Sequence, residues 1–238
     1  MASATLSDST IVGTLLESKA GVAVPPGAGD WLSRFDQVYR EADGQLEKVP
    51  WAHTKPCPSM ISWLNAEAPS LVRCGARAAV VGCGLGEDAA ALVERGYDAV
   101  AFDCSPTAVS WAKRRHPEHA EIFVQGDLFN LPSRLRHRFD LVIEVHTLQS
   151  LPPAYRPALA AGMASLLSPR GGILLAVTRG RDPGVSLDSI DGPPFPFTAS
   201  ELSALMEANE LAPVRPLDEF LDDSESPVRR IRGAFKRF

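Results

Sequence analysis

The stretch Ala78-Ala-Val-Val-Gly82-Cys-Gly84-Leu-Gly86 decides the fold, because three glycines at alternate positions close a run of small apolar residues. The acidic, alanine-rich segment Glu87-Asp-Ala-Ala-Ala-Leu follows directly and predicts the start of a helix. A second apolar run, Ala99-Val-Ala-Phe-Asp103, ends in an acid 21 residues after Gly82. A glycine turn after one strand and a carboxylate at the tip of the next together predict a crevice that binds a nucleoside.

The spacing of these glycines separates two classes of cofactor. A dinucleotide fingerprint reads G-x-G-x-x-G and directs a helix N-terminus at a pyrophosphate. Here the third glycine comes one residue early, and Glu87 and Asp88 place negative charge where the phosphates would lie. A ribose-bearing cofactor without phosphate and with a positive sulfonium, S-adenosylmethionine, fits better. An NAD-dependent oxidoreductase is the alternative, since Asp103 could also bind the ribose of NAD.

Acids at the ends of predicted strands are the candidate cofactor ligands. Asp103 can accept two hydrogen bonds from a vicinal diol, although it could instead cap the helix that follows. In Gly126-Asp127-Leu128, Asp127 can accept from an adenine amino group while Leu128 packs on the ring, or the acid can simply form a turn. Glu144 ends another apolar run and could face the sulfonium or the methionyl amino group, or it could pair with a loop donor.

Two histidines are candidate proton acceptors. His146 and His53 could each remove a proton from a phenol, amine or thiol, because an imidazole titrates near neutral pH. Either could equally be a hydrogen-bonded structural group. No cluster of histidines and carboxylates calls for a metal, so we expect none.

The composition is that of a globular domain. The chain has 238 residues, 45% hydrophobic and 22% charged, with a net charge of −5, which gives no basic excess for binding nucleic acid. No apolar run is long enough to span a bilayer. The four cysteines have no CxxC spacing, which favours reduced thiols and a cytoplasmic location. We expect a flexible segment over 1–28, with a possible helix at 11–19, and one domain over 29–238.

Alternating strand and helix patterns predict an α/β fold of the doubly wound, Rossmann-like class. Nearly all-apolar runs predict buried parallel strands at 78–81, 99–102, 122–124, 140–145 and 173–177. Helices are predicted at 31–39, 60–68, 87–95, 106–115, 153–167 and 199–209. The segments 211–221 and 228–238, joined by the acidic turn 222–227, predict an antiparallel hairpin added to the sheet.

These motifs together resemble the class I S-adenosylmethionine-dependent methyltransferases. The resemblance rests on Val80-Val-Gly-Cys-Gly-Leu-Gly-Glu-Asp-Ala89, Ala101-Phe-Asp-Cys-Ser-Pro-Thr-Ala108, Phe139-Asp-Leu-Val-Ile-Glu144 and Leu167-Ser-Pro-Arg-Gly-Gly172. Val49-Pro-Trp51, Pro56-Cys-Pro58 and Gly192-Pro-Pro-Phe-Pro-Phe197 are similar to the thiopurine S-methyltransferase and halide/thiol methyltransferase group. The chain departs from that group at Ala52 and in the triplet Glu144-Val-His146.

The resemblance implies a seven-stranded sheet of order 3-2-1-4-5-7-6 with strand 7 antiparallel, and an N-terminal helical cap over 29–72 on a core over 73–238. It also implies that Trp31 covers the cofactor and that the residues lining it are Gly82, Gly84, Asp103, Asp127 and Glu144. Together with the motif analysis, the expected cofactor-binding set is Trp31, Gly82, Cys83, Gly84, Gly86, Asp103, Cys104, Asp127, Leu128 and Glu144.

The sequence thus predicts a methyltransferase that moves the methyl of S-adenosylmethionine to a small molecule, a thiol or another soft or aromatic nucleophile. A thiol ionises near neutral pH and needs no strong base. An oxygen or nitrogen acceptor would need His146, His53 or Glu144 as general base. Besides the oxidoreductase, a non-catalytic protein that binds S-adenosylmethionine is an alternative.

Overall fold

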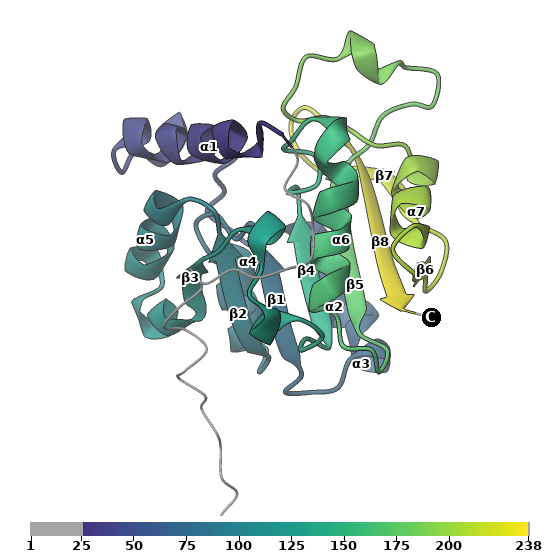
Figure 1. Ribbon diagram of the computed structural model, residues 1–238, viewed down its shortest axis with the longest axis horizontal. Helices are drawn as coiled ribbons and strands as arrows, with labels where there is room; N and C mark the ends of the chain where they lie inside the picture. The colour runs from purple at the N-terminus through teal and green to yellow at the C-terminus, as the bar shows by residue number, and fades with distance from the viewer. Residues whose placement is uncertain (1–25, 238) are drawn as a thin grey trace, which may run out of the picture.

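The computed structural model describes residues 26–237, which form a sheet covered by helices on both faces (Figure 1). The strands are β1 Arg77–Val81, β2 Asp98–Asp103, β3 Phe123–Gln125, β4 Leu141–Val145, β5 Ile173–Arg179, β6 Leu211–Pro213, β7 Asp218–Leu221 and β8 Arg229–Arg237. The α-helices are α1 Ala28–Ala42, α2 Pro58–Ala66, α3 Ala68–Leu71, α4 Glu87–Glu94, α5 Pro106–Arg115, α6 Arg156–Leu166 and α7 Ala199–Glu207. Short 3-10 turns lie at Leu46–Lys48, Pro117–Ile122, Leu128–Asn130, Ser133–Leu135, Pro153–Tyr155 and Leu187–Ser189.

The strand order is β3-β2-β1-β4-β5-β8-β6, with β7 also paired to β8. Strands β1 to β5 are parallel, and β8 runs antiparallel to β5. The predicted order is confirmed, with β8 in the place of the seventh strand. The order reverses between β1 and β4, and such a switch point opens a crevice at the carboxyl ends of the strands.

Each face of the sheet has its own core because successive strand side chains point to opposite sides. In β1, Ala79 and Val81 face the core formed with α6 and α7, whereas Ala78 and Val80 face the core formed with α2, α4 and α5. The parallel strands are therefore apolar on both faces, which is the pattern that marked them in the sequence.

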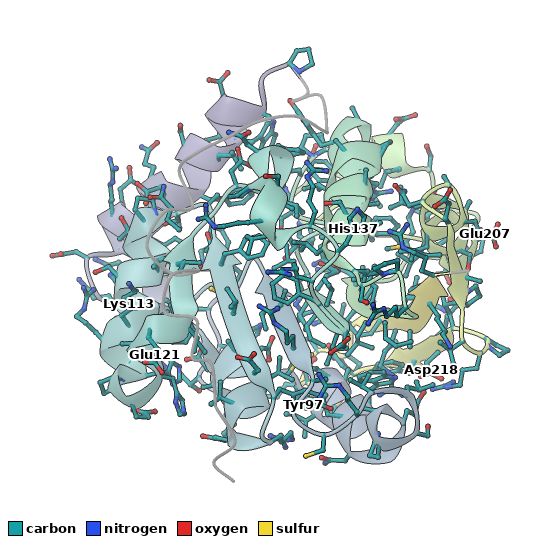
Figure 2. The ribbon with its side chains drawn as sticks, turned by 60° about the horizontal axis from the view of Figure 1, so that its bottom comes forward. Tyr97, Lys113, Glu121, His137, Glu207 and Asp218 are labelled. Carbon is teal, nitrogen blue, oxygen red and sulfur yellow. The ribbon has the colours of Figure 1, made fainter. Side chains whose placement is uncertain are left out.

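The predicted C-terminal hairpin is present, but its first arm is split into β6 and β7. Both pair antiparallel with β8, so the sheet has eight strands in place of the expected seven. Pro213 and Pro216 explain the break, because a proline has no N–H to donate to the ladder. Asp218, at the lower right in Figure 2, accepts from Arg232 at 2.6 Å and Arg215 at 2.7 Å, which holds β7 against β8.

Helix α1, at the upper left of Figure 1, forms a cap above α5 and the β2–β3 side of the sheet. Asp36 of α1 is buried and accepts from the Ser105 hydroxyl at 2.8 Å and from the Thr107 N–H at 3.1 Å. Ser105 in turn caps α5 by accepting from the Ala108 N–H, as its place before Pro106 indicates. The cap is therefore tied to the start of α5, beside the end of β2.

Several boundaries differ from the sequence prediction by one to three residues, as ends of elements commonly do. The expected helix at 153–167 is a 3-10 turn followed by α6, and the helix at 60–68 is divided into α2 and α3. The possible helix at 11–19 lies outside the described residues. None of the helices that the structure describes is long and apolar enough to cross a membrane.

Candidate active site

A cavity of about 750 Å³ lies at the carboxyl ends of the strands, beneath the cap. The sheet order divides its lining into two halves. We call the first the β1–β3 half, which includes Gly82, Gly84, Asp103, Asp127 and Leu128. The second is the β4–β8 half, which includes Val145, His146, Val177, Phe220 and Arg230. The cavity thus spans the switch point, where a cofactor on one side can meet a second ligand on the other.

The glycine turn is tight because protein side chains fill the space beside it. Gly82 and Gly84 both have positive φ, 61° and 52°. A Cβ on Gly82 would lie 2.5 Å from the Thr147 hydroxyl, and a Cβ on Gly84 would lie 3.3 Å from the Tyr39 hydroxyl. Because these two residues have no Cβ, Thr147 from the loop after β4 and Tyr39 from α1 can pack against the turn. The backbone of the turn also stays open to the cavity.

Asp103 lies at the tip of β2 as predicted and is 8% exposed. Its Oδ2 accepts from the Gly84 N–H at 3.0 Å, and its Oδ1 accepts from the Ser105 N–H at 2.9 Å. Burial raises the pKa of this carboxyl. A carboxylate has about four acceptor sites, so each oxygen can still take a hydrogen bond from a diol.

The rest of the β1–β3 half is suited to an aromatic ring. Asp127 accepts from the Phe129 N–H at 2.9 Å, so one oxygen forms the turn that was the alternative interpretation, and burial raises the pKa of its carboxyl. Leu128 and Phe129 line the cavity beside it. Cys83 and Cys104 also line it, and burial raises the pKa of both thiols well above the usual value. These two thiols therefore stay protonated and act as small apolar groups.

Glu144 is fully buried in β4 and is absent from the lining of the cavity. Its Oε2 accepts from the N–H groups of Thr147 at 2.7 Å and Leu148 at 3.0 Å. Its Oε1 has no hydrogen-bond partner among the described residues, and burial raises the pKa of the carboxyl to about 8. The geometry thus matches the alternative interpretation, a carboxyl paired with loop donors that shapes the turn after β4.

His146 lines the cavity, but its Nε2 lies 3.1 Å from Nη1 of Arg230. Burial, with smaller contributions from Arg230 and His53, lowers the pKa of His146 to about 3. His146 is therefore neutral at physiological pH and binds a proton weakly. His53, the other predicted base, is exposed at the rim and also lines the cavity.

Besides Glu144, two more predicted residues, Trp31 and Gly86, lie outside the lining. The ring of Trp31 packs edge-on against Phe195, with centroids 6.4 Å apart, and Arg34 stacks over it. Gly86 starts α4 with φ 96°, and a Cβ there would lie 2.7 Å from the ring of Phe123. The aromatic residues of the N-terminal region that do line the cavity are Phe35 and Tyr39 of α1 and Trp51 of the segment that follows it.

Sequence reasoning gave no binding or proton-accepting role to several polar residues of the lining. Asp88 accepts from the Cys57 N–H at 2.7 Å, and burial raises the pKa of its carboxyl to about 6. Arg230 and Asp222 reach the cavity from β8 and from the turn before it. Arg230 lies in the basic run Arg229-Arg-Ile-Arg232, and no local pattern marks which of these arginines faces the cavity. Within residues 26–237, no group of three or more His, Cys, Asp or Glu side chains could hold a metal ion.

The family model for thiopurine S-methyltransferase matches residues 45–235, which extends from just after the end of α1 almost to the end of β8. The chain belongs to the thiopurine S-methyltransferase family. It is 30% identical over 170 residues to the probable thiol methyltransferase 2 of Arabidopsis thaliana, covering 70% of each chain. It is 25% identical over 189 residues to the 2-heptyl-1-hydroxyquinolin-4(1H)-one methyltransferase of Mycobacteroides abscessus, covering 76% of this chain and 79% of that one.

The fold is also that of solved methyltransferases. The Burkholderia thailandensis 1,6-didemethyltoxoflavin-N1-methyltransferase, solved with S-adenosylhomocysteine, superposes with a TM-score of 0.68 at 19% identity and covers 92% of both chains. The predicted family, the fold class and the cofactor are thereby confirmed. This member of the family is an S-adenosylmethionine-dependent methyltransferase of small molecules.

Proposed function

We propose that the protein transfers the methyl of S-adenosylmethionine to a small thiol, with the cofactor in the β1–β3 half of the cavity and the thiol in the β4–β8 half. The β1–β3 half suits the adenosine: Asp103 offers free acceptor sites to the ribose, and Leu128 and Phe129 offer apolar faces to the adenine. Asp127 would accept from the adenine amino group. The cofactor supplies an electrophilic methyl group, and the cavity aligns it with the acceptor away from water.

The state of His146 is the observation that favours a thiol. With Nε2 engaged by Arg230 and its pKa lowered to about 3 by burial, the imidazole is a poor base. Glu144 lies outside the cavity lining, the other imidazole of the lining, His53, is exposed, and the Asp222 carboxylate is already engaged by Arg230 at 2.8 Å. A thiol loses its proton to water readily, so among the candidate acceptors it has the least need of a general base in the protein. The name of the Arabidopsis thiol methyltransferase agrees with this proposal.

Release of S-adenosylhomocysteine tests the proposal directly. The full chain would be incubated with S-adenosylmethionine and, separately, an alkyl thiol, an aromatic thiol, a phenol, a hydroxyquinolone and an aromatic amine. We expect product with the thiols. Turnover of only the phenol, the hydroxyquinolone or the amine would refute the choice of acceptor. If no compound of the panel releases S-adenosylhomocysteine although the cofactor binds, a non-catalytic role is favoured.

A further inference from the structure

The turn before β8 is held closed over the β4–β8 half by Asp222. The Asp222 N–H donates to the Val228 carbonyl at 3.0 Å, and its Oδ1 accepts from the Val228 N–H at 3.0 Å and from the Ser224 hydroxyl at 2.6 Å. Its Oδ2 accepts from Nε of Arg230 at 2.8 Å. Asp222 and Ser224 both line the cavity. The turn is therefore one wall of the acceptor half, fixed to the strand that follows it.

Arg230 links the turn to the loop after β4, because it binds both Asp222 and His146. Its side chain is 19% exposed, with Nε on Asp222 and Nη1 on Nε2 of His146. A guanidinium is always protonated and can only donate, so Nε2 of His146 must accept. The imidazole is then the tautomer with its proton on Nδ1. Arg230 thus decides which ring nitrogen of His146 is a donor.

The backbone of His146 is fixed as well. Its φ is 65°, in the left-handed region that few side-chain-bearing residues adopt. Its N–H donates to the Val177 carbonyl at 2.9 Å, and its carbonyl accepts from the Ser150 hydroxyl at 2.7 Å. The charged and titratable groups that face the ring are Arg230 from β8, Asp222 from the turn and His53 from the loop before α2.

We propose that Asp222 and Arg230 are positioning residues that hold His146 as a neutral hydrogen-bond donor, so that the site accepts nucleophiles that arrive already deprotonated. This inference rests on the proposed methyl transfer to a thiol. The thiol gives its proton to water before it reacts. The thiolate lone pair then forms the bond to the methyl carbon, and the bond between that carbon and the sulfonium breaks with its electron pair left on the sulfonium sulfur. No proton passes to the protein.

The pH dependence of kcat/KM for two thiols of different pKa tests this inference. If the acceptor arrives ionised, the midpoint of the rising limb moves with the pKa of each thiol. A midpoint that is the same for both thiols would mean that a protein group takes the proton, and it would overturn the inference. In the Arg230→Met variant Nε2 of His146 is released, so we expect kcat/KM to fall about tenfold and the ring proton to exchange between Nδ1 and Nε2, while burial still keeps the ring neutral.

Arg229→Met is the matched control, because Arg229 lies next to Arg230 in β8 but pairs with Asp182 and Glu219 at the surface. It should keep the wild-type profile. Nitrogen NMR of His146 gives a readout that does not depend on turnover: in the wild type the ring should stay neutral between about pH 5 and 8, with its proton on Nδ1. A ring that titrates in that range would refute the positioning role. If no thiol is methylated, the proposed function fails, and the NMR result still decides the state of His146.

Discussion

The carboxyl of Glu144 should make the protein less stable as the pH rises, and Glu144→Gln should remove that effect. Burial raises the pKa of Glu144 from 4.5 to about 8. Between these two pH values the folded protein therefore keeps a proton on Glu144 that the unfolded chain has lost. Stability falls with pH wherever the folded state binds more protons. A glutamine can accept from the Thr147 and Leu148 N–H groups as the protonated acid does, without ever ionising.

The size of the effect follows from the width of that range. One proton held only by the folded state changes the free energy of unfolding by about 1.4 kcal/mol per pH unit. The difference between Glu144→Gln and the wild type should therefore be small below about pH 4, where the carboxyl of Glu144 is protonated in both the folded and the unfolded state, and grow by about 2–3 kcal/mol between pH 5 and 7. Above pH 8 the difference should level off. Asp88 and Asp103 also have raised pKa values, but they are present in both proteins and cancel in the difference.

Urea unfolding followed by circular dichroism at several pH values measures this difference. Glu207→Gln is the control, because Glu207 lies on the outer surface of α7, at the right edge of Figure 2, and loses the same formal charge. Its unfolding free energy should run parallel to that of the wild type. If Glu144→Gln also runs parallel to the wild type, the buried carboxyl is ionised in the folded protein and the reasoning is wrong.

Three further substitutions test the site and the cap. Asp103→Ala should weaken S-adenosylhomocysteine binding by about 1.5–3 kcal/mol, the scale of hydrogen bonds to a charged group; calorimetry that finds an unchanged dissociation constant would remove the ribose assignment. Gly82→Ala should lower the unfolding free energy by about 1–3 kcal/mol, because a Cβ would meet Thr147 at positive φ; pairing it with Thr147→Ser, which removes only the methyl group, should recover little of this loss, since the hydroxyl is the nearest atom. Asp36→Ala should loosen α1 and speed amide exchange in the cap, and exchange that stays as slow as in the wild type would exclude Asp36 as its anchor.

The parallel core could be predicted from the sequence because its signals are local. Strands buried on both faces show up as short, wholly apolar runs, and Ser105 before Pro106 marks the start of α5. Asp103 could be placed at the tip of β2 for the same reason, since a strand end and an acid coincide there. The hairpin was predicted as a unit. The separation of β6 from β7 could not be predicted, because it depends on where Pro213 and Pro216 fall along the backbone hydrogen bonds to β8.

The β4–β8 half could not be predicted, because its contacts join residues far apart in the chain. His146 and Arg230 are separated by 84 positions, and neither carries a motif that names the other. The sequence presents His146 as a histidine after a strand, which suits a base equally well. Only the neighbouring guanidinium shows that Nε2 is engaged, and it is chiefly burial that lowers the pKa of the ring. Trp31 is the reverse case, an aromatic residue of the cap whose ring turns to Phe195 and away from the cavity lining.

The two halves of the cavity differ in how freely they can change. The β1–β3 half is built from strand tips and a glycine turn whose side-chain space is already filled by Thr147 and Tyr39, so a substitution there disturbs the fold as well as the ligand. The β4–β8 half uses the turn at 222–228 and the loop at 53–57, which connect elements and tolerate change. If the cofactor and the acceptor occupy the halves proposed for them, the scaffold fixes the cofactor side, leaves the acceptor side to loops, and can exchange acceptors while keeping the methyl donor. Sequence differences between this chain and its relatives should therefore alter the acceptor first, and substitutions around Arg230 are where that change should be sought.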